Sequence, residues 1–329
     1  MAAAAAAGAG ADEEVDFEFF PIIRRYKGGR VERFMNIPPL PAGTDPATGV
    51  TSKDVVVDPA VGLWARLFLP PGGGAPQGKL PVVVYYHGGA YVVGSAADPF
   101  THSYLNGLVA EAGILAVALE YRLAPEHHLP AAYDDSWEGL RWVASHANGG
   151  GGVEPWLLEH GDFSRVFLAG ASAGGNIAHY VAARAGEHGG LGLSIRGLLV
   201  VHPYFSGAAD ICAEGTTGKA EKAKADEFWR FIYPGSPGLD DPLSNPFSDA
   251  AGGISAARVA ADRVLVCVAE KDSLRDRGVW YYESLKASGY AGEVDLLESM
   301  GEGHVFYCMD PRCERAWEMQ ARILSFLRK

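Results

Sequence analysis

The chain has 329 residues, of which 48% are hydrophobic, and a formal net charge of −12 at pH 7. This length and apolar content are sufficient for one large domain with a buried core. The acidic balance argues against nucleic acid as a partner, because phosphate binding needs basic surface that releases counterions.

The first ten residues are almost all alanine and glycine, and no lysine or arginine precedes Arg24. A secretory signal combines a basic start with a longer apolar stretch, which this segment lacks. We therefore expect residues 1–14 to be disordered. No segment approaches the roughly 18 uninterrupted apolar residues that a membrane span requires.

The cysteine pattern bears on the cellular compartment. The four cysteines are Cys212, Cys267, Cys308 and Cys313, and none of them forms a Cys-x-x-Cys pair. Cys267 lies inside an apolar run, where a buried and reduced thiol is typical. We expect a disulfide-free, cytoplasmic protein.

Eight apolar runs recur along the chain, and several are apolar throughout, as in strands that are buried on both faces. They are Asp54–Val57, Leu63–Leu69, Val82–Tyr86, Ile114–Glu120, Val166–Ala169, Leu198–His202, Val264–Ala269 and Val294–Leu297. Helical stretches lie between or after the later runs, at Phe100–Glu111, Ala131–His146, Ala173–Arg184, Arg275–Ser288 and Arg312–Leu327. This alternation predicts an α/β fold with a mostly parallel, eight-stranded sheet covered by helices on both faces. The short first connection predicts an antiparallel start.

Two regions interrupt the alternation. Residues 12–50 are aromatic, basic and proline-rich, without the rhythm of a strand, and residues 205–250 separate the sixth strand from the seventh. The second region includes a helical pattern at Ala220–Tyr233. Long inserts in compact domains are often lids or binding loops. We expect segments 15–50 and 205–250 to form a lid on a single domain spanning residues 1–329.

A candidate nucleophile follows the fifth strand, in Gly170-Ala171-Ser172-Ala173-Gly174. Gly-x-Ser-x-Gly between a strand and a helix is typical of a nucleophile elbow, a sharp turn that exposes the serine hydroxyl. The small residues around Ser172 permit such a turn. Because a five-residue pattern also arises by chance, its meaning depends on a base, an acid and an oxyanion hole elsewhere in the chain.

The base and the acid have candidates in the expected chain order. A serine hydroxyl needs a base to take its proton, and imidazole has the right basicity near neutral pH. Asp272 follows the seventh strand and His304 follows the eighth, 100 and 132 residues after Ser172. The order serine, acid, histidine is that of elbow-type hydrolases. All three side chains belong at the carboxyl ends of strands, where open α/β sheets bind ligands.

Other residues compete for these roles. His202 ends the sixth strand at the same edge, although no loop acid is paired with it in the sequence, and His179 is interpreted as facing the helix packing. The remaining candidates are interpreted as solvated surface, namely His102, His127, His128, His146, His160 and His188. Glu270 and Asp276 are rivals to Asp272, but Asp276 falls one turn into the next helix.

The segment Tyr86-His87-Gly88-Gly89 follows the third strand directly. Acyl transfer places negative charge on the carbonyl oxygen in the transition state, and backbone N–H groups commonly stabilise it. Gly88 and Gly89 let the backbone approach a substrate, and the N–H of Ala173 adds a donor. Alone, the segment would also fit a simple glycine turn. His87 is interpreted as bracing the loop.

Together these motifs resemble the hormone-sensitive-lipase group of α/β-hydrolases, and in particular its plant carboxylesterases. His87-Gly88-Gly89 is similar to the oxyanion motif of the group, and Asp272–Asp276 and Gly303-His304 are similar to its acid and histidine segments. Tyr121–Asp135 resembles a further stretch with structural duties. The resemblance covers residues 15–328 and implies a lid formed by the N-terminal segment and the insert before the seventh strand.

The same group contains other functions. Gibberellin receptors share the fold without the histidine, so the presence of His304 argues against a purely receptor role. 2-Hydroxyisoflavanone dehydratases often carry threonine at the elbow, so Ser172 favours ester hydrolysis and leaves dehydration open. The resemblance implies a serine carboxylesterase for small or medium esters, with no cofactor and no metal. A hormone-binding, receptor-like protein is the other alternative.

Aromatic residues gather around the insert, namely Tyr204, Phe205, Phe228, Trp229, Phe231 and Tyr233. They fit the packing of a lid against the body at least as well as an apolar pocket for acyl groups. We take Tyr204, Phe205, Trp229 and Val305 as candidate substrate contacts. The expected partner is a small-molecule ester, and a homodimer is left open.

Overall fold

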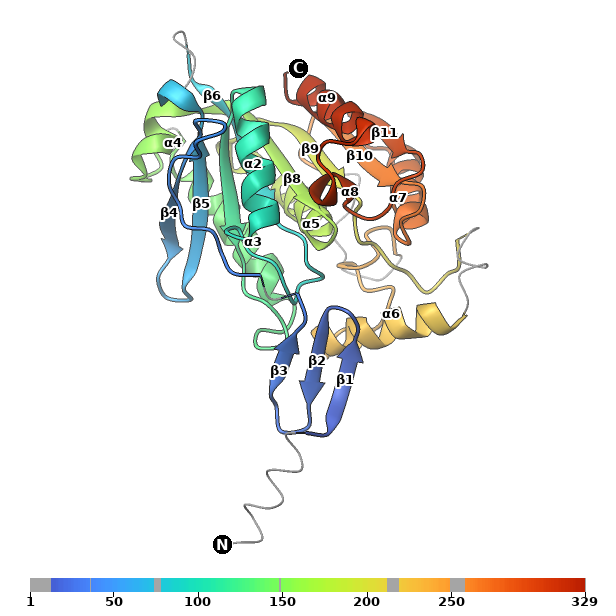
Figure 1. Cartoon of the computed structure of the whole chain (residues 1–329). Helices are drawn as coiled ribbons and strands as arrows, with labels where there is room; N and C mark the ends of the chain where they lie inside the picture. Colours follow the sequence, from blue (N-terminus) through green and yellow to red (C-terminus); the bar gives the residue numbers. More distant parts are fainter. Residues whose placement is uncertain are drawn as a thin grey trace, which may run out of the picture.

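The computed structural model describes residues 13–35, 37–73, 78–147, 149–211, 219–248 and 258–328. At its centre is a sheet in the order β11-β10-β9-β8-β6-β7-β5-β4 (Figure 1). Its strands are β4 (Thr51–Asp58), β5 (Leu63–Leu69), β6 (Leu80–Tyr86), β7 (Leu115–Glu120), β8 (Gly161–Ala171), β9 (Ile195–Val201), β10 (Arg263–Ala269) and β11 (Glu293–Ser299). β4 with β5 and β5 with β7 are antiparallel, and the other neighbours are parallel. The predicted sheet and its antiparallel start are confirmed.

Helices cover both faces of the sheet. α2 (Pro99–Ala112) and α9 (Glu314–Arg328) pack together on one face, and α3 (Ala131–Ala144), α5 (Ala173–Glu187) and α7 (Arg275–Ala287) lie on the other. Successive residues of a strand point to opposite faces. In β6, Val82 and Val84 accordingly join one core cluster, and Val83 and Tyr85 join the other. This two-sided burial explains why the central strands are apolar throughout.

The predicted helices agree with the observed ones within a few residues at each end. Two short helices were not predicted, α4 (Pro155–His160) and α8 (Phe306–Met309), nor were the short 3-10 turns Pro71–Gly73 and Gly189–Gly192. These elements are too short to show the apolar periodicity on which the prediction of a helix rests.

The N-terminal region corrects the prediction that residues 12–50 lack strands. β1 (Val15–Phe19), β2 (Ile23–Tyr26) and β3 (Val31–Arg33) form an antiparallel sheet, here called the N-terminal sheet. Its strands have only three to five residues, too few for alternation to be visible. Cross-strand ion pairs such as Arg25–Asp16 support it.

Most of the segment that was expected to be disordered, residues 1–14, lies outside the described residues. Residues 1–12 lie outside the described ranges. Glu14 is already tied to the N-terminal sheet, because its carbonyl oxygen accepts a hydrogen bond of 2.9 Å from the Lys27 amide. Glu14 is thus bonded to the N-terminal sheet, contrary to the expectation for this residue.

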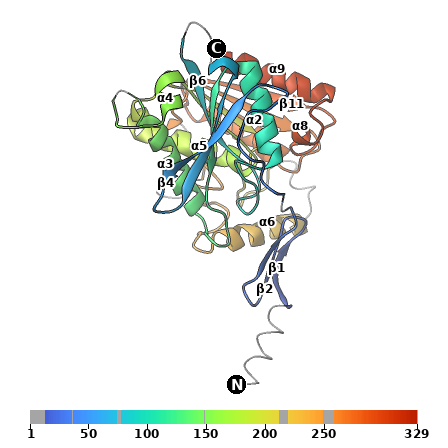
Figure 2. The ribbon, with the colours of Figure 1, turned by 60° about the vertical axis from the view of Figure 1, so that its left-hand side comes forward.

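The two irregular regions of the sequence pack against each other. α6 (Lys219–Ile232) coincides with the predicted insert helix and lies beside β1 and β2, as Figures 1 and 2 both show. The ring of Phe17 stacks on Phe231 at a centroid distance of 3.9 Å, and Phe19 lies 4.4 Å from Phe228. Two segments about 200 residues apart in sequence thus pack together outside the main sheet.

Two further expectations concern thiols and membranes. Cys267, Cys308 and Cys313 are free thiols, and Cys212 lies outside the described residues. Among the helices of the described ranges, none combines the length and apolar character needed to cross a membrane.

Two histidines that were expected on the surface are buried. His102 lies with Nδ1 3.2 Å from Nη1 of Arg66, and Nε2 of His146 accepts the amide N–H of Glu154 at 3.0 Å. Both imidazoles satisfy polar groups inside the fold, a role that the local sequence does not reveal. His179, by contrast, has the predicted packing role, with 4% of its surface exposed and Nδ1 2.8 Å from the Tyr281 hydroxyl oxygen.

The burial of His179 predicts an acid-sensitive fold. Desolvation lowers its pKa from 6.5 to about 3, so below pH 6.5 the unfolded chain binds a proton that the folded chain does not. The contribution of His179 to the free energy of unfolding is therefore fully present above pH 6.5. It is lost as the pH falls toward 3. Between pH 7 and pH 5 the loss should be about 2 kcal/mol. Urea unfolding at the two pH values measures it.

His179→Gln should remove this part of the pH dependence. His188→Gln is the matched control, because His188 is exposed at the end of the same helix. An equal pH dependence in both variants would show that His179 does not contribute.

Candidate active site

Ser172 lies in the sharp turn between β8 and α5. Its backbone dihedrals are φ 55° and ψ −120°, a region that costs an L-residue about 1–3 kcal/mol and needs support from its surroundings. The Ser172 N–H donates to the Val201 carbonyl oxygen at 2.9 Å, and the Ser172 carbonyl oxygen accepts from the Tyr204 N–H at 3.0 Å. Neighbouring segments thus hold the strained serine in place.

The two glycines of the motif are required by close backbone contacts. A Cβ atom on Gly170 would lie 2.1 Å from the Gly174 carbonyl oxygen. A Cβ atom on Gly174 would lie 2.0 Å from the carbonyl oxygen of Tyr86. Neither distance is physically accessible, so the Gly-x-Ser-x-Gly pattern is a steric requirement of this turn.

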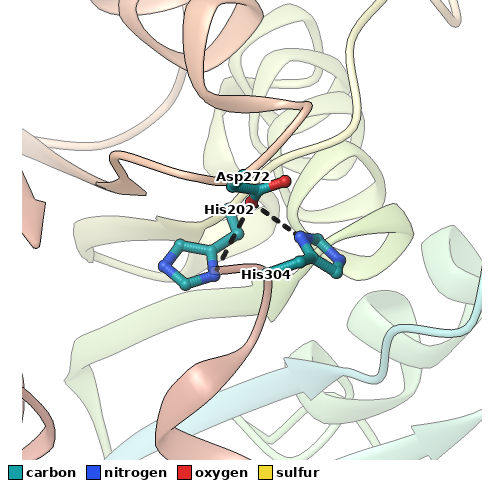
Figure 3. Close-up of side chains that lie close together, drawn as sticks. All are labelled: His202, Asp272 and His304. Carbon is teal, nitrogen blue, oxygen red and sulfur yellow. Dashed lines mark hydrogen bonds and ion pairs between the residues drawn. The ribbon is translucent and has the colours of Figure 1, made fainter. Parts of the chain in front are cut away.

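The structure brings Ser172, His304 and Asp272 into one hydrogen-bonded series. His304 Nε2 lies 3.1 Å from Ser172 Oγ, and His304 Nδ1 lies 2.7 Å from Asp272 Oδ2. The Asp272 side chain is only 1% exposed, and its Oδ1 accepts the Leu274 N–H at 2.9 Å. A fixed carboxylate therefore orients the His304 imidazole (Figure 3). The other ring nitrogen of His304 reaches the serine hydroxyl.

The two rival acids make other contacts. Glu270 Oε2 accepts the Gly301 N–H at 2.7 Å. Asp276 pairs with Arg275 at 2.7 Å. Among these three acids, Asp272 is the one that contacts His304.

His202 is closer to the acid than the sequence analysis expected. Its Nδ1 lies 3.9 Å from Asp272 Oδ2, so the statement that no acid accompanies it is wrong. The same Nδ1 accepts the Val305 N–H at 2.9 Å, and burial lowers the pKa of His202 to about 4. The imidazole is therefore neutral near pH 7 and holds Val305, whose φ is 48°. Its contact with the backbone, rather than with Ser172, distinguishes it from His304.

The cluster His202, Asp272 and His304 could be considered a metal site, because its ligand atoms lie within 4.8 Å of one another (Figure 3). The hydrogen bonds do not fit that role. The Nδ1 lone pair of His202 is engaged by the Val305 N–H, and Nδ1 of His304 shares its proton with Asp272. The donor set is organised to orient His304.

Backbone donors lie next to the serine. A Cβ atom on Gly88 would be 3.0 Å from the Ala171 carbonyl oxygen and 3.4 Å from Ser172 Cβ, so this loop runs directly against Ser172. Gly89 has φ 110°, which other residues rarely adopt. Ala173 is the first residue of α5, where amide N–H groups have no acceptor within the helix. The Gly88 loop and the start of α5 thus both adjoin Ser172, and the roles of Gly88, Gly89 and Ala173 as oxyanion donors stay a prediction.

His87 has the bracing position predicted for it. Its Nδ1 lies 2.7 Å from the Gly88 carbonyl oxygen, and its ring stacks on Tyr121 at a centroid distance of 4.2 Å. The Tyr121 hydroxyl donates to the His87 carbonyl oxygen at 2.8 Å. The Tyr121–Asp135 stretch also has an internal contact, because the guanidinium of Arg122 donates hydrogen bonds to the carboxylate of Asp135.

The four candidate substrate contacts differ in position. Phe205, 2% exposed, stacks on Tyr281, and Trp229, 0% exposed, donates from Nε1 to Ser236 Oγ at 2.9 Å. In this conformation both have packing roles, and contact of either residue with a substrate stays a prediction. Tyr204 and Val305 are only partly buried and flank the site through their neighbours Ser172 and His304.

The fold agrees with comparisons to known proteins. The family described as the α/β hydrolase fold matches residues 83–308, and the chain belongs to this family. It is 42% identical to a 2-hydroxyisoflavanone dehydratase of Glycyrrhiza echinata over 332 residues, covering 98% of this chain and 99% of the relative. It is 44% identical to the chloroplastic tuliposide A-converting enzyme 1 of Tulipa gesneriana over 317 residues, covering 96% and 79%.

Other similar proteins are esterases by name. The chain is 39% identical to probable carboxylesterase 2 of Arabidopsis thaliana over 315 residues, covering 96% of this chain and 97% of that protein. Among solved structures, an esterase of the archaeon Pyrobaculum calidifontis matches with a TM-score of 0.65 and 28% identity, covering 84% of each chain.

Proposed function

We propose that the protein is a serine carboxylesterase that hydrolyses small or medium carboxylic esters through an acyl-enzyme intermediate. The observation that carries this proposal is the series from Ser172 Oγ to His304 Nε2 at 3.1 Å and from His304 Nδ1 to Asp272 Oδ2 at 2.7 Å. Membership of the α/β-hydrolase family and similarity to proteins named esterases support it.

In the proposed reaction, His304 takes the proton of Ser172 as Oγ attacks the ester carbonyl carbon. The N–H groups of Gly88, Gly89 and Ala173 donate to the oxyanion that forms. The carbon–oxygen bond to the alcohol then breaks, and His304 gives its proton to the departing oxygen. Water repeats the sequence on the acyl-enzyme and releases the acid. Every proton is carried by a side chain of this chain, so the reaction uses no cofactor.

The environment of Asp272 suits its proposed part in this reaction. As His304 accepts a proton it becomes a cation, and a buried carboxylate 2.7 Å away stabilises that charge. The bond to Nδ1 also directs the basic lone pair of Nε2 toward Ser172. His202 stays neutral beside them, because burial lowers its pKa to about 4, and so does not compete for the negative charge near pH 7.

A preference for short acyl chains is expected. The aromatic side chains between the main sheet and α6 pack tightly against one another, since Tyr91 contacts both Tyr204 and Trp229 edge to face. A long chain would have to open this packing. We expect kcat/KM for a p-nitrophenyl butyrate to exceed that for the palmitate at least about tenfold. Steady-state kinetics on a series of chain lengths measures it.

Phe17→Ala is the variant that accompanies this series. It removes the ring stacked on Phe231 and should loosen the packing of α6. The difference in kcat/KM between short-chain and long-chain esters should therefore become smaller. Equal rates on both chain lengths in the wild type would refute the closed packing as a determinant of substrate size.

The second candidate function is dehydration, which the similarity to the dehydratase over nearly the whole chain favours. In that reaction His304 would take a proton from a 2-hydroxyisoflavanone, the bond between carbon and the hydroxyl oxygen would break, and His304 would return the proton to the departing hydroxide, which leaves as water. Mass spectrometry separates the two activities: dehydration lowers the mass of the substrate by one water, whereas hydrolysis yields an acid and an alcohol.

The remaining parts of the proposal concern the substrate contacts and the location. Tyr204 and Val305, which flank the serine and the histidine, are proposed to contact the substrate. A cytoplasmic location is proposed on the basis of the free thiols of Cys267, Cys308 and Cys313.

A further inference from the structure

Arg33, the last residue of β3, reaches from the N-terminal sheet to the body of the protein. Its Nε donates to the Val92 carbonyl oxygen at 2.6 Å, and Nη2 donates to the Ala124 carbonyl oxygen at 3.1 Å. Its Nη1 donates to Glu126 Oε1 at 3.0 Å, and Nη2 also contacts the Glu126 carboxylate. One guanidinium group thus binds two separate loops.

The first of these loops carries the proposed oxyanion donors. The N–H groups of Val92 and Val93 both donate to the Gly89 carbonyl oxygen, at 3.0 and 2.9 Å, so Val92 closes the turn that begins at Gly89. Within this turn Ala90 and Tyr91 have φ values of 53° and 63°. Residues other than glycine rarely adopt such φ values. These values persist only when contacts from outside the turn hold the backbone.

The second loop closes the same arrangement. The Ala124 N–H donates to the Tyr91 carbonyl oxygen at 2.9 Å, so the loop around residue 124 is bonded to the oxyanion turn as well as to Arg33. Glu126 fixes the direction of the guanidinium, and the ion pair with Arg33 lowers the pKa of this carboxyl group. The planar fork of arginine suits such simultaneous contacts, whereas the single ammonium of lysine does not.

Other arginines of the N-terminal sheet have different contacts. Arg24 pairs with Glu18 and Glu32 and lies over Phe34, all within residues 18–34. Arg25 pairs with Asp16 and lies over Phe231 of α6. Of these three arginines, Arg33 is the one that contacts the oxyanion turn, and its side chain is only 24% exposed there.

We propose that Arg33 is a positioning residue for the oxyanion hole, and that the N-terminal sheet is thereby a working part of the active site. This inference rests on the proposed esterase function. Arg33 touches no reacting atom; it acts through the Val92 carbonyl, which holds the turn that presents the Gly88 and Gly89 N–H groups. Movement of the N-terminal sheet would then change the geometry of the oxyanion donors directly.

The test compares Arg33→Ala, Arg33→Lys and the matched control Arg24→Ala. For a short-chain aryl ester, we expect Arg33→Ala to lower kcat about 10- to 100-fold with little change in KM, because misplaced donors weaken transition-state binding. Arg33→Lys should recover only part of this loss. Arg24→Ala should keep the kcat of the wild type, because the contacts of Arg24 lie within the N-terminal segment.

An inhibitor gives a second readout that a general loss of stability would not produce. A trifluoromethyl ketone adds to a serine hydroxyl and places an oxyanion in the same hole. Its Ki should rise in Arg33→Ala by about the factor by which kcat falls. The inference is overturned if Ki and kcat stay at wild-type values, or if Arg33→Ala and Arg24→Ala lose activity equally.

Hydrogen exchange separates this inference from the proposed function. The amides of Val92 and Val93 should exchange faster in Arg33→Ala than in the wild type or Arg24→Ala, whether or not esters are turned over. Unchanged exchange contradicts the positioning role. A wild type without ester turnover contradicts the proposed function instead, and the exchange data still decide whether Arg33 holds the turn.

Discussion

Ser172→Ala is expected to lower kcat for a short-chain aryl ester by about 10⁴- to 10⁶-fold. The alanine removes the attacking oxygen and leaves the elbow intact, because Ser172 contributes its backbone N–H and carbonyl groups to the fold. Turnover of the ester is measured on the purified protein. The mass of the intact protein is measured separately, after treatment with an aryl phosphonate. The wild type should gain one phosphonyl group, and the variant should gain none.

Ser325→Ala is the matched control for this experiment, since Ser325 is exposed on α9, away from the carboxyl edge of the sheet. It should behave as the wild type in both assays. A Ser172→Ala protein that turns over the ester at the wild-type rate, or that is still phosphonylated once, would eliminate Ser172 as the nucleophile.

Asp272→Asn is expected to lower kcat by about 10⁴-fold. The asparagine has nearly the same shape, but its amide can present a donor to Nδ1 of His304 and so favour the tautomer whose Nε2 carries the proton. Such a histidine cannot accept the proton of Ser172, and its protonated form loses the stabilising charge 2.7 Å away. The measurement is kcat as a function of pH, together with a thermal melt to verify folding.

Glu270→Gln and Asp276→Asn are the controls that identify the acid. Both carboxylates flank Asp272 in sequence, and both contact other partners, the Gly301 N–H and Arg275. Their variants should retain activity near that of the wild type. A large loss in Glu270→Gln beside a small loss in Asp272→Asn would reverse the assignment.

The centre of the main sheet was predictable because strands such as β6, β8 and β9 are buried on both faces and therefore largely apolar. β6, from Leu80 to Tyr86, is buried at every position, so composition alone marks it. The N-terminal sheet was not predictable in this way. Its short strands are held by ion pairs and by the contact of Phe17 with Phe231, a residue that no local pattern connects to it.

The same distinction applies to the site. Ser172, Asp272 and His304 could be located because each follows a predicted strand, and the carboxyl ends of parallel strands share one edge. The position of the His202 side chain could not be derived, since its contact with Val305 depends on how two loops meet. Arg33 lies 59 residues before Val92, and a single arginine in a basic segment carries no signal of such a contact.

Positive backbone φ values outside glycine are concentrated at one edge of this molecule. In the described ranges they occur at Ala90, Tyr91, Ser172, Leu191, His202 and Val305, and all but Leu191 surround the proposed nucleophile. Each costs about 1–3 kcal/mol of folding free energy. A chain selected for stability alone would have glycine or asparagine at these positions. The edge around the proposed nucleophile is therefore where the backbone lowers the thermodynamic stability of this protein. We expect substitutions that stabilise the fold at this edge to reduce the proposed activity.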